Sequence, residues 1–368
     1  MRNLLCLVLL AGFGIPPNTA AQSFLDTLVR LEAPETMAEA ITAASKPGNG
    51  SRQEFWLGLQ FDLRDDIKFR LIHITENGGV NIETGENRLN YNSGWTKEPW
   101  FNMAYLRTMG IRAQPPNWGL FIRYSTPSGR FKPDKIILAT FDSVDRSDFD
   151  ADVFWAAGVP TTASFDYLRA AVEEGRHPDS IRRAGAFALS LYDHPDLIKT
   201  LAKTLSKSTT DKIFKDVALW LALIPRPESL DVLTAEYGRT TGTERKKHLI
   251  FAISQHGSDA SAKALIEIAD SEKSHESRKD AIFWLGQLAG RKTLQVLSDI
   301  AMSDPELEIK KHAVFVLSQH GEKDEAAELL IGIAETHPEP EVRKAAMFWL
   351  GQTDSDKALV FFRKVLSD

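Results

Sequence analysis

One stretch of the sequence decides the fold of the C-terminal part: Arg343–Gln352, which reads RKAAMFWLGQ. Aligning it with upstream segments places one large apolar residue at each of seven positions, Phe154, Phe187, Leu219, Phe251, Phe283, Phe315 and Phe348. These positions are separated by 33, 32, 32, 32, 32 and 33 residues. Chance does not maintain so constant a spacing, which therefore predicts repeated structural units.

Each predicted unit contains a first helix around the motif, a break, and a second apolar helix such as 293–301 or 326–334. The breaks coincide with helix-ending residues, among them Pro225, Gly257 and Gly321. Since one helical hairpin cannot bury both faces of its helices, consecutive hairpins are expected to stack. Residues 148–368 are thus predicted to form an all-α solenoid of about seven repeats.

Two of these units, Ser277–Gly286 and Glu341–Gly351, resemble the short HEAT repeat, including its phycobilisome-lyase-like variant, as in exported bacterial HEAT-repeat proteins. The resemblance implies HEAT-type hairpins stacked into a curved scaffold that binds other macromolecules. The lyase members of the family attach chromophores, and that activity is not carried over to this chain.

The N-terminal residues are typical of a secretory signal. Arg2 precedes an apolar run from Leu4 to Ile15, which is too short to span a bilayer as a helix. Residues 1–21 are predicted to be a signal peptide cleaved near Ala21, so the mature protein is expected to be periplasmic or secreted, without a transmembrane segment. Residues 22–51 are expected to be a helical segment and linker.

Between linker and solenoid, residues 52–147 are predicted to form a small β-rich domain of unknown type. Apolar residues alternate with mostly polar ones from Phe55 to Leu63, as in a half-buried strand. The segment is dense in aromatic residues, either as the core of the domain or as exposed faces that stack on sugars: Trp56, Trp95, Trp100, Phe101, Tyr105 and Trp118.

Composition excludes several kinds of function. The chain has 44 Lys and Arg against 50 Asp and Glu, a net charge of −6, which argues against nucleic acid as the main ligand. Its one cysteine, Cys6, lies in the predicted signal, so no disulfide, thiol nucleophile or cysteine-ligated metal is expected after cleavage.

No motif for a catalytic or metal site stands out. The histidine pairs His248/His256 and His312/His320 are each spaced by eight residues rather than the four that bring two imidazoles to one ion. No phosphate-binding loop or nucleophile elbow occurs. We therefore expect a protein that is not an enzyme, with no cofactor and no metal.

A regular stripe recurs on the last four predicted first helices, and we call it the outer row. Positions i, i+4 and i+8 of a helix lie on one slowly drifting face. The outer row consists of Lys247, Phe251, Gln255, Lys279, Phe283, Gln287, Lys311, Phe315, Gln319, Lys344, Phe348 and Gln352. It is either a surface that holds an extended peptide of a protein partner or the filling of the seam between repeats.

The residue after each aligned aromatic alternates between large and small: Trp155, Ala188, Trp220, Ala252, Trp284, Val316 and Trp349. A tryptophan of one copy is expected to lie over the small residue of the next. The packing unit is therefore predicted to be a pair of hairpins.

Three functions remain open at this point. The first is an exported scaffold that binds a protein through the solenoid. The second is a carbohydrate- or envelope-binding module in the β-rich domain, and the third is an enzyme with a site between the domains. The sequence does not indicate the oligomeric state.

Overall fold

A computed structural model describes residues 26–32, 34–46, 53–64, 70–74, 80–84, 87–91, 118–126, 129–141, 146–173, 175–208, 210–288 and 291–367. The predicted signal peptide lies outside these residues. The chain divides into two compact units, Met1–Thr200 and Leu201–Asp368. Among the described residues, no helix is both long and apolar enough to cross a membrane.

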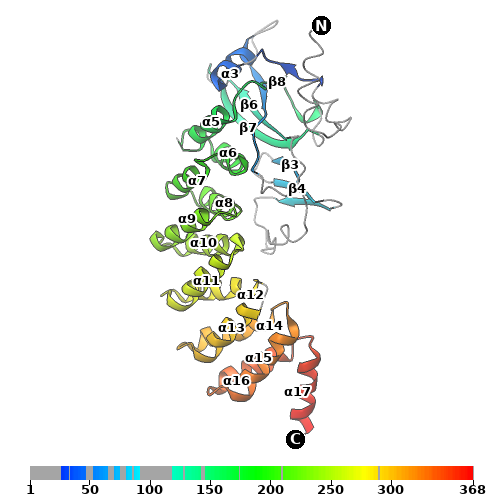
Figure 1. The fold of residues 1–368 in the computed structure, drawn as a ribbon, viewed down its shortest axis with the longest axis vertical. Coiled ribbons are helices and arrows are strands. Elements are labelled where there is room, and N and C mark those ends of the chain that lie inside the picture. The colour runs from blue at the N-terminus through cyan, green and yellow to red at the C-terminus, as the bar shows by residue number, and fades with distance from the viewer. Residues whose placement is uncertain are drawn as a thin grey trace. The chain divides into compact units, whose positions relative to one another are not determined.

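The first unit contains a five-stranded sheet with the order β1-β8-β2-β6-β7 (Figure 1). Its strands are β1 (Val29–Arg30), β2 (Glu54–Leu59), β6 (Trp118–Ser125), β7 (Lys132–Thr140) and β8 (Val153–Trp155). β2, β6 and β7 are antiparallel neighbours, whereas β8 runs parallel to both β1 and β2. A separate antiparallel sheet consists of β3 (Arg70–Ile74), β4 (Val80–Thr84) and β5 (Asn87–Tyr91).

The strand β8 corrects one part of the predicted repeat register. The spacing predicts that Phe154 and Trp155 lie on the first helix of a first copy, but they belong to β8 and pair with Val29 and Arg30 of β1. The motif copy at Phe154 is therefore not a helical repeat. The segment is short, apolar and buried on both sides, a pattern that periodicity alone cannot distinguish from a buried helix.

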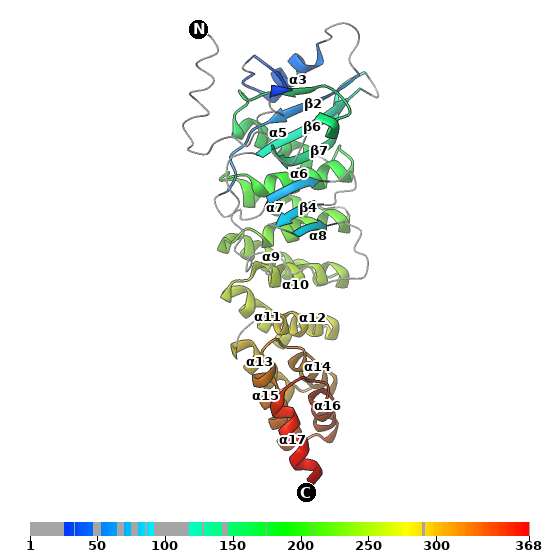
Figure 2. The same ribbon diagram turned by 90° about the vertical axis from the view of Figure 1, so that its right-hand side faces the viewer.

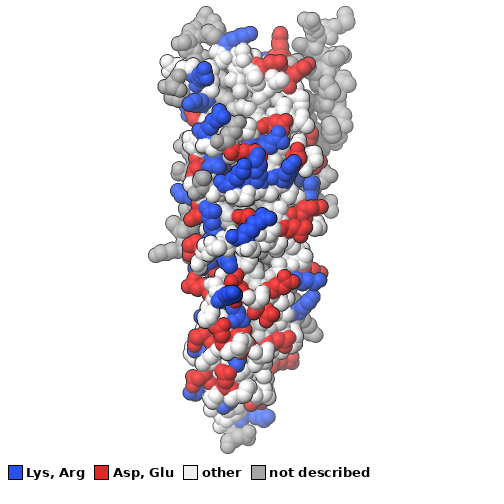
Figure 3. All heavy atoms as spheres, turned by 90° about the vertical axis from the view of Figure 1, so that its left-hand side faces the viewer, with Lys and Arg blue, Asp and Glu red and all other residues white. Residues whose placement is uncertain are grey.

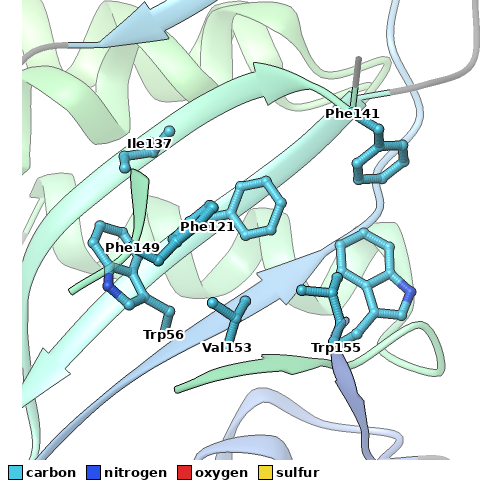
Figure 4. Close-up of a cluster of buried hydrophobic side chains, with 8 residues drawn as sticks. Trp56, Phe121, Ile137, Phe141, Phe149, Val153 and Trp155 are labelled. Carbon is cyan, nitrogen blue, oxygen red and sulfur yellow. The ribbon is translucent and has the colours of Figure 1, made fainter. Parts of the chain in front are cut away.

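Aromatic side chains fill the core beside this sheet (Figure 4). The rings of Trp56 and Phe149 meet edge to face with centroids 5.2 Å apart, and Phe141 meets Trp155 in the same way at 5.3 Å. Gly58 makes this packing possible, because a Cβ atom there would lie 2.7 Å from the ring of Trp155. The interpretation of Trp56 as a core residue is confirmed, since it is fully buried.

Helices complete the first unit. Helix α3 (Met37–Ser45) begins at the N-cap Thr36, whose side chain accepts a hydrogen bond from the amide of Glu39. It packs on β2. After the short 3-10 helix η1 (Arg146–Asp148), α5 (Thr161–Glu173) pairs with α6 (Asp179–Leu191), and α6 packs on β7.

The remainder of the chain consists of helical hairpins. Their first helices are α6, α8 (Asp211–Ala222), α10 (Thr243–His256), α12 (His275–Gly286), α14 (Leu307–Ser318) and α16 (Pro340–Leu350). Their second helices are α7 (Leu197–Ser206), α9 (Pro227–Arg239), α11 (Asp259–Ser271), α13 (Arg291–Ser303), α15 (Lys323–Thr336) and α17 (Asp356–Ser367). Six of the seven aligned positions thus lie on first helices.

The hairpins of the second unit stack in sequence order (Figure 2). First helices pack side by side from α8 through α10, α12 and α14 to α16, and second helices such as α13 and α15 pack on the first helix that follows. The turns between helices occur at residues whose type favours ending or capping a helix. Gly257 ends α10 in the left-handed conformation with φ of 67°, and Ser258 then caps α11. The C-terminal part is therefore an α-solenoid preceded by a small β-sheet region, as predicted.

Candidate partner-binding surface

The lysines and phenylalanines of the outer row lie on the first helices α10, α12, α14 and α16, whereas only one of its glutamines, Gln255, lies within a helix. Gln287 and Gln319 are the C-cap residues of α12 and α14, and Gln352 lies two residues beyond the end of α16. The row becomes more exposed toward α16. Phe251, Phe283 and Phe315 are half-buried, whereas Phe348 is 60% exposed. The glutamines follow the same gradient: Gln255 is buried, Gln287 is half-buried, and Gln319 and Gln352 are exposed. The row therefore offers solvent-accessible side chains mainly on α14 and α16.

The phenylalanines of the outer row pack against two tryptophans. Trp284 meets Phe251 of the preceding first helix at 4.9 Å between ring centroids, and Phe283 of its own helix at 5.2 Å. Trp349 repeats this arrangement with Phe315 at 4.8 Å and Phe348 at 5.0 Å. The aromatic rings thus form two clusters of three, one on α10 and α12 and the other on α14 and α16.

These clusters give the tryptophans of the large and small alternation a definite packing role. Trp284 and Trp349 each make a ring contact with the phenylalanine of the preceding copy. The small residue Val316 lies against Gly286, where a Cβ atom would come within 2.1 Å of its Cγ1. In these four copies, two successive hairpins share one tryptophan.

Glutamates accompany the lysines of the outer row. Lys311 lies 3.0 Å from Glu308, and Lys344 lies 2.9 Å from Glu341, each pair spanning three residues of one helix. These lysines lower the pKa of Glu308 and of Glu341. Because both signs alternate along the face, the outer row is not a basic stripe, and these exposed pairs weaken as salt is added.

Lys247 is held more firmly than its counterparts. Its Nζ atom lies 3.5 Å from Glu244 on α10 and 3.2 Å from Glu276 on α12, so it joins two repeats. The hydrogen bond with Glu276 raises the pKa of Lys247. At this end of the outer row, the lysine connects neighbouring first helices.

An inner row of cations lies one position before the lysines of the outer row, and it was missed in the sequence. It consists of Lys246, Arg278 and Lys310, whose side chains are 18%, 6% and 9% exposed. Each cation pairs with a carboxylate at the turn before the next first helix, namely Glu272, Asp304 and Glu339 respectively. The inner row therefore links each of these first helices to the turn that leads into the next first helix.

One cation of the inner row and one of its carboxylate partners bind additional groups. Arg278 donates from Nε to the carbonyl oxygen of Ala269 at 2.7 Å and from Nη1 to Glu306 at 2.9 Å. Glu272 accepts from Lys246 and from the Tyr237 hydroxyl, each at 2.6 Å. The bond from Lys246 and, second, that from Tyr237 lower the pKa of Glu272 to about 2.

The histidines are held by backbone groups of neighbouring repeats. Nε2 of His256 lies 3.2 Å from the carbonyl oxygen of Arg226, and Nε2 of His320 lies 3.2 Å from that of Leu288. Burial lowers the pKa of His312, whose Nε2 lies 3.0 Å from the carbonyl oxygen of Lys279. In the described part of the chain, no three His, Cys, Asp or Glu side chains are grouped as a metal site would require.

The alternative surface, formed by aromatics of the β-sheet region, receives no support from Trp56. Its ring is buried, and its Nε1 donates to Asp150 at 2.9 Å. Burial opposes ionisation of Asp150, but the bond from Trp56 and the charge of Arg123 nevertheless lower its pKa. Trp95, Trp100, Phe101 and Tyr105 lie outside the described residues, as does the side chain of Trp118.

The repeat architecture agrees with one known family over part of the chain. Residues 261–346 match HEAT repeats. This HEAT segment runs from α11 to α16 and contains two of the four phenylalanines of the outer row, Phe283 and Phe315. HEAT repeats commonly mediate protein interactions, and the segment has the architecture of a helical repeat scaffold.

Solved structures also resemble the chain. Human deoxyhypusine hydroxylase in complex with glycerol is 14% identical with a TM-score of 0.25, and the match covers 55% of this chain and 90% of that chain. The complex of CpcE and CpcF of phycocyanin lyase from Nostoc sp. PCC7120 is 17% identical with a TM-score of 0.27, covering 55% and 81% respectively. No curated protein matches the sequence. Nothing about activity follows from likeness at this level.

Proposed function

We propose that this protein is an exported, non-catalytic scaffold that binds a protein partner through the outer row of its HEAT-type solenoid. The observation that carries the proposal is the 60% exposure of Phe348 between Lys344 and Gln352, which are also exposed. An exposed aromatic ring flanked by a cation and an amide offers apolar contact together with hydrogen-bond donors and an acceptor. A protein segment presents complementary groups along its backbone.

The proposal assigns partner binding to the part of the row on α14, α16 and the turns that follow them. There Gln319, Phe348 and Gln352 are exposed, while at α10 the corresponding Gln255 is buried. Since Phe251, Phe283 and Phe315 also fill the seams beside Trp284 and Trp349, their replacement would disturb packing as well as binding. A test of binding must therefore use the exposed positions.

The experiment is a comparative capture with the full chain. The triple variant Lys344→Ala, Phe348→Ala, Gln352→Ala and its parent are used as baits, with cross-linking and mass spectrometry of the captured proteins. The proposal expects one protein to be enriched with the parent and lost with the triple variant. The matched control Glu335→Ala alters an exposed residue of α15 and should retain that protein.

Two results would overturn the binding proposal. The first is retention of every partner by the triple variant at unchanged melting temperature. The second is enrichment of glycan rather than protein with the parent.

Export is tested separately, by expressing the chain with its own N-terminus and sequencing the mature protein from the cell envelope and the medium. A mature chain that still begins at Met1 would contradict export by a cleaved signal.

A further inference from the structure

Exposed large apolar side chains are concentrated on α17. Four of them lie there, Leu359 at 51%, Val360 at 64%, Val365 at 44% and Leu366 at 85% exposure. The opposite side of the helix is docked, since Ala358 and Phe361 are buried. Contiguous apolar surface on a folded protein commonly marks an interaction site.

The exposed side of α17 is built like a covered side of α15. When the two helices are aligned on their buried alanines, Ala326 and Ala358, the residues Leu359, Phe362 and Val365 correspond to Ala327, Leu330 and Ile333. Those three residues of α15 are 0%, 0% and 2% exposed. Helix α15 is covered by α16, whereas no described helix covers the outer side of α17 (Figures 1 and 2).

The spacing on α17 suits pairing with another helix. Leu359, Phe362 and Leu366 lie at i, i+3 and i+7, the spacing of the apolar seam in helix pairs. The exposed charges differ between the two ends of the same helix. Asp354 and Asp356 stand at its beginning, and Arg363 and Lys364 stand near its end, all four exposed. The remaining cation at the beginning, Lys357, donates to Glu328 of α15 and is neutralised there. Asp356 and Arg363 are seven residues apart and therefore share one edge of the seam.

We propose that a second copy of this chain covers this face, with the two α17 helices antiparallel about a two-fold axis. In that arrangement Leu359 of each copy lies near Phe362 of the other. The acidic beginning of each helix lies beside the basic end of the other, so opposite charges face each other at both ends of the pair. A parallel pairing would instead bring like charges together. A two-fold axis makes one self-complementary patch serve both copies, and antiparallel helix dipoles favour the same arrangement.

The contact is limited in size. A single helix pair buries less than the roughly 1,200–2,000 Å² of a standard stable interface. The dimer is therefore in exchange with the monomer at micromolar concentrations. The substitutions that test this surface lie on and just before α17 and leave Lys344, Phe348 and Gln352 of the outer row unchanged, so the two proposals can fail independently.

The test measures oligomeric state by sedimentation velocity over a concentration series. The parent is expected to shift from monomer to dimer as concentration rises, and Leu359→Glu with Leu366→Glu should raise the dissociation constant at least about tenfold, because carboxylates would be buried in the seam. The control Met302→Glu changes an exposed apolar residue of α13 and should leave the dissociation constant unchanged.

A charge exchange tests the orientation and does not depend on apolar residues. The first variant carries Arg363→Glu and Lys364→Glu, and the second carries Asp354→Lys and Asp356→Lys. Each alone should dimerise less than the parent, and an equal mixture should form heterodimers visible by native mass spectrometry. A parent that stays monomeric throughout the series, or a mixture that forms no heterodimer, overturns the proposal. So does a parent that remains monomeric while binding vesicles that contain phosphatidylglycerol.

Discussion

The pairing of Arg278, a cation of the inner row, with Asp304 illustrates how much stability can depend on a single residue. Both side chains are 6% exposed, and Asp304 also accepts from the amide of Glu306 at 2.9 Å. Replacing Arg278 by Leu would leave a buried carboxylate without its cation. We expect the free energy of unfolding to fall by about 3–5 kcal/mol, measured by urea denaturation.

The matched comparison is Lys344→Ala, which removes a cation of the outer row. The side chain of Lys344 is 72% exposed, and its glutamate partner is exposed too, so water replaces the pair and stability should not change measurably. Adding Asp304→Asn to Arg278→Leu should recover part of the loss, since the buried charge is then gone. Equal effects of Arg278→Leu and Lys344→Ala would contradict the distinction between the two rows.

Glu272 gives the inner row a dependence on pH. Its pKa is about 2 in the folded protein against 4.5 ordinarily, so the stability that its ionised form contributes is present above pH 4.5. That contribution is lost as pH falls from 4.5 toward 2. The destabilisation caused by Glu272→Gln should therefore be largest near neutral pH and shrink over this range. Thermal melting of both proteins at several pH values measures it, and a difference that stays constant down to pH 2 would refute it.

The sequence could predict the outer row but not which of its side chains would be exposed. The regular recurrence of Phe at one helical position revealed the stripe, and the burial of Gln255 beside the exposure of Gln352 depends on neighbours that a single helix does not specify. The inner row escaped notice because Lys246, Arg278 and Lys310 look like ordinary surface cations. They can be buried because each one pairs with a carboxylate that lies 26 to 29 residues later in the sequence.

At the scale of elements, the contact between α12 and α14 depends on the absence of a side chain at Gly286. A Cβ atom there would lie 2.1 Å from Cγ1 of Val316, a branched side chain with little freedom to move. Gly286→Ala should therefore lower the free energy of unfolding by about 1–3 kcal/mol. Adding Val316→Ala should relieve the clash, so the two substitutions are expected to be non-additive in denaturation experiments.

Gly332 on α15 provides the control for helix propensity. Nothing lies within 4 Å of a Cβ atom built there, so Gly332→Ala should raise stability by about 0.5–1 kcal/mol through reduced backbone entropy. Opposite signs for the two Gly→Ala substitutions would confirm that close helix approach, rather than helix propensity, selects Gly286. Stabilisation by both would contradict the packing of α12 on α14.

Helices could be predicted from the sequence where the same motif recurs at a constant spacing over many repeats. Six first helices follow the spacing of 32 or 33 residues, and helix-ending residues such as Gly257 mark their ends. The three residues of β8 were not predictable, because a buried strand of that length has no period of its own. Its partners, β1 and β2, are also too far away in sequence to be inferred from a local pattern.

At the scale of the whole molecule, charged side chains of both signs are mixed over the face drawn in Figure 3. Cohesion within the solenoid comes from contacts between helices of neighbouring hairpins. Local destabilisation in such an array is expected to spread to adjacent repeats and then decline.

Amide hydrogen exchange of Gly286→Ala tests this behaviour. Exchange should accelerate in α12 and α14, and less in α10 and α16, while β2, β6 and β7 keep the protection of the parent. A uniform acceleration in both compact units would show that the chain unfolds as one cooperative body. Mass spectrometry of peptic fragments has the resolution to distinguish the two outcomes.

The position of β8 also sets an order of events during synthesis. Among the described strands β1 pairs only with β8, and the 122 residues between Arg30 and Val153 must be translated first. At roughly 5–20 residues per second this delay is on the order of 6–24 s. During that interval β1 and the adjoining side of β2 present unpaired amides and carbonyls, which attract other extended chains. The N-terminal sheet is therefore most prone to misassociation while the nascent chain is still on the ribosome, before any helix of the solenoid has been made.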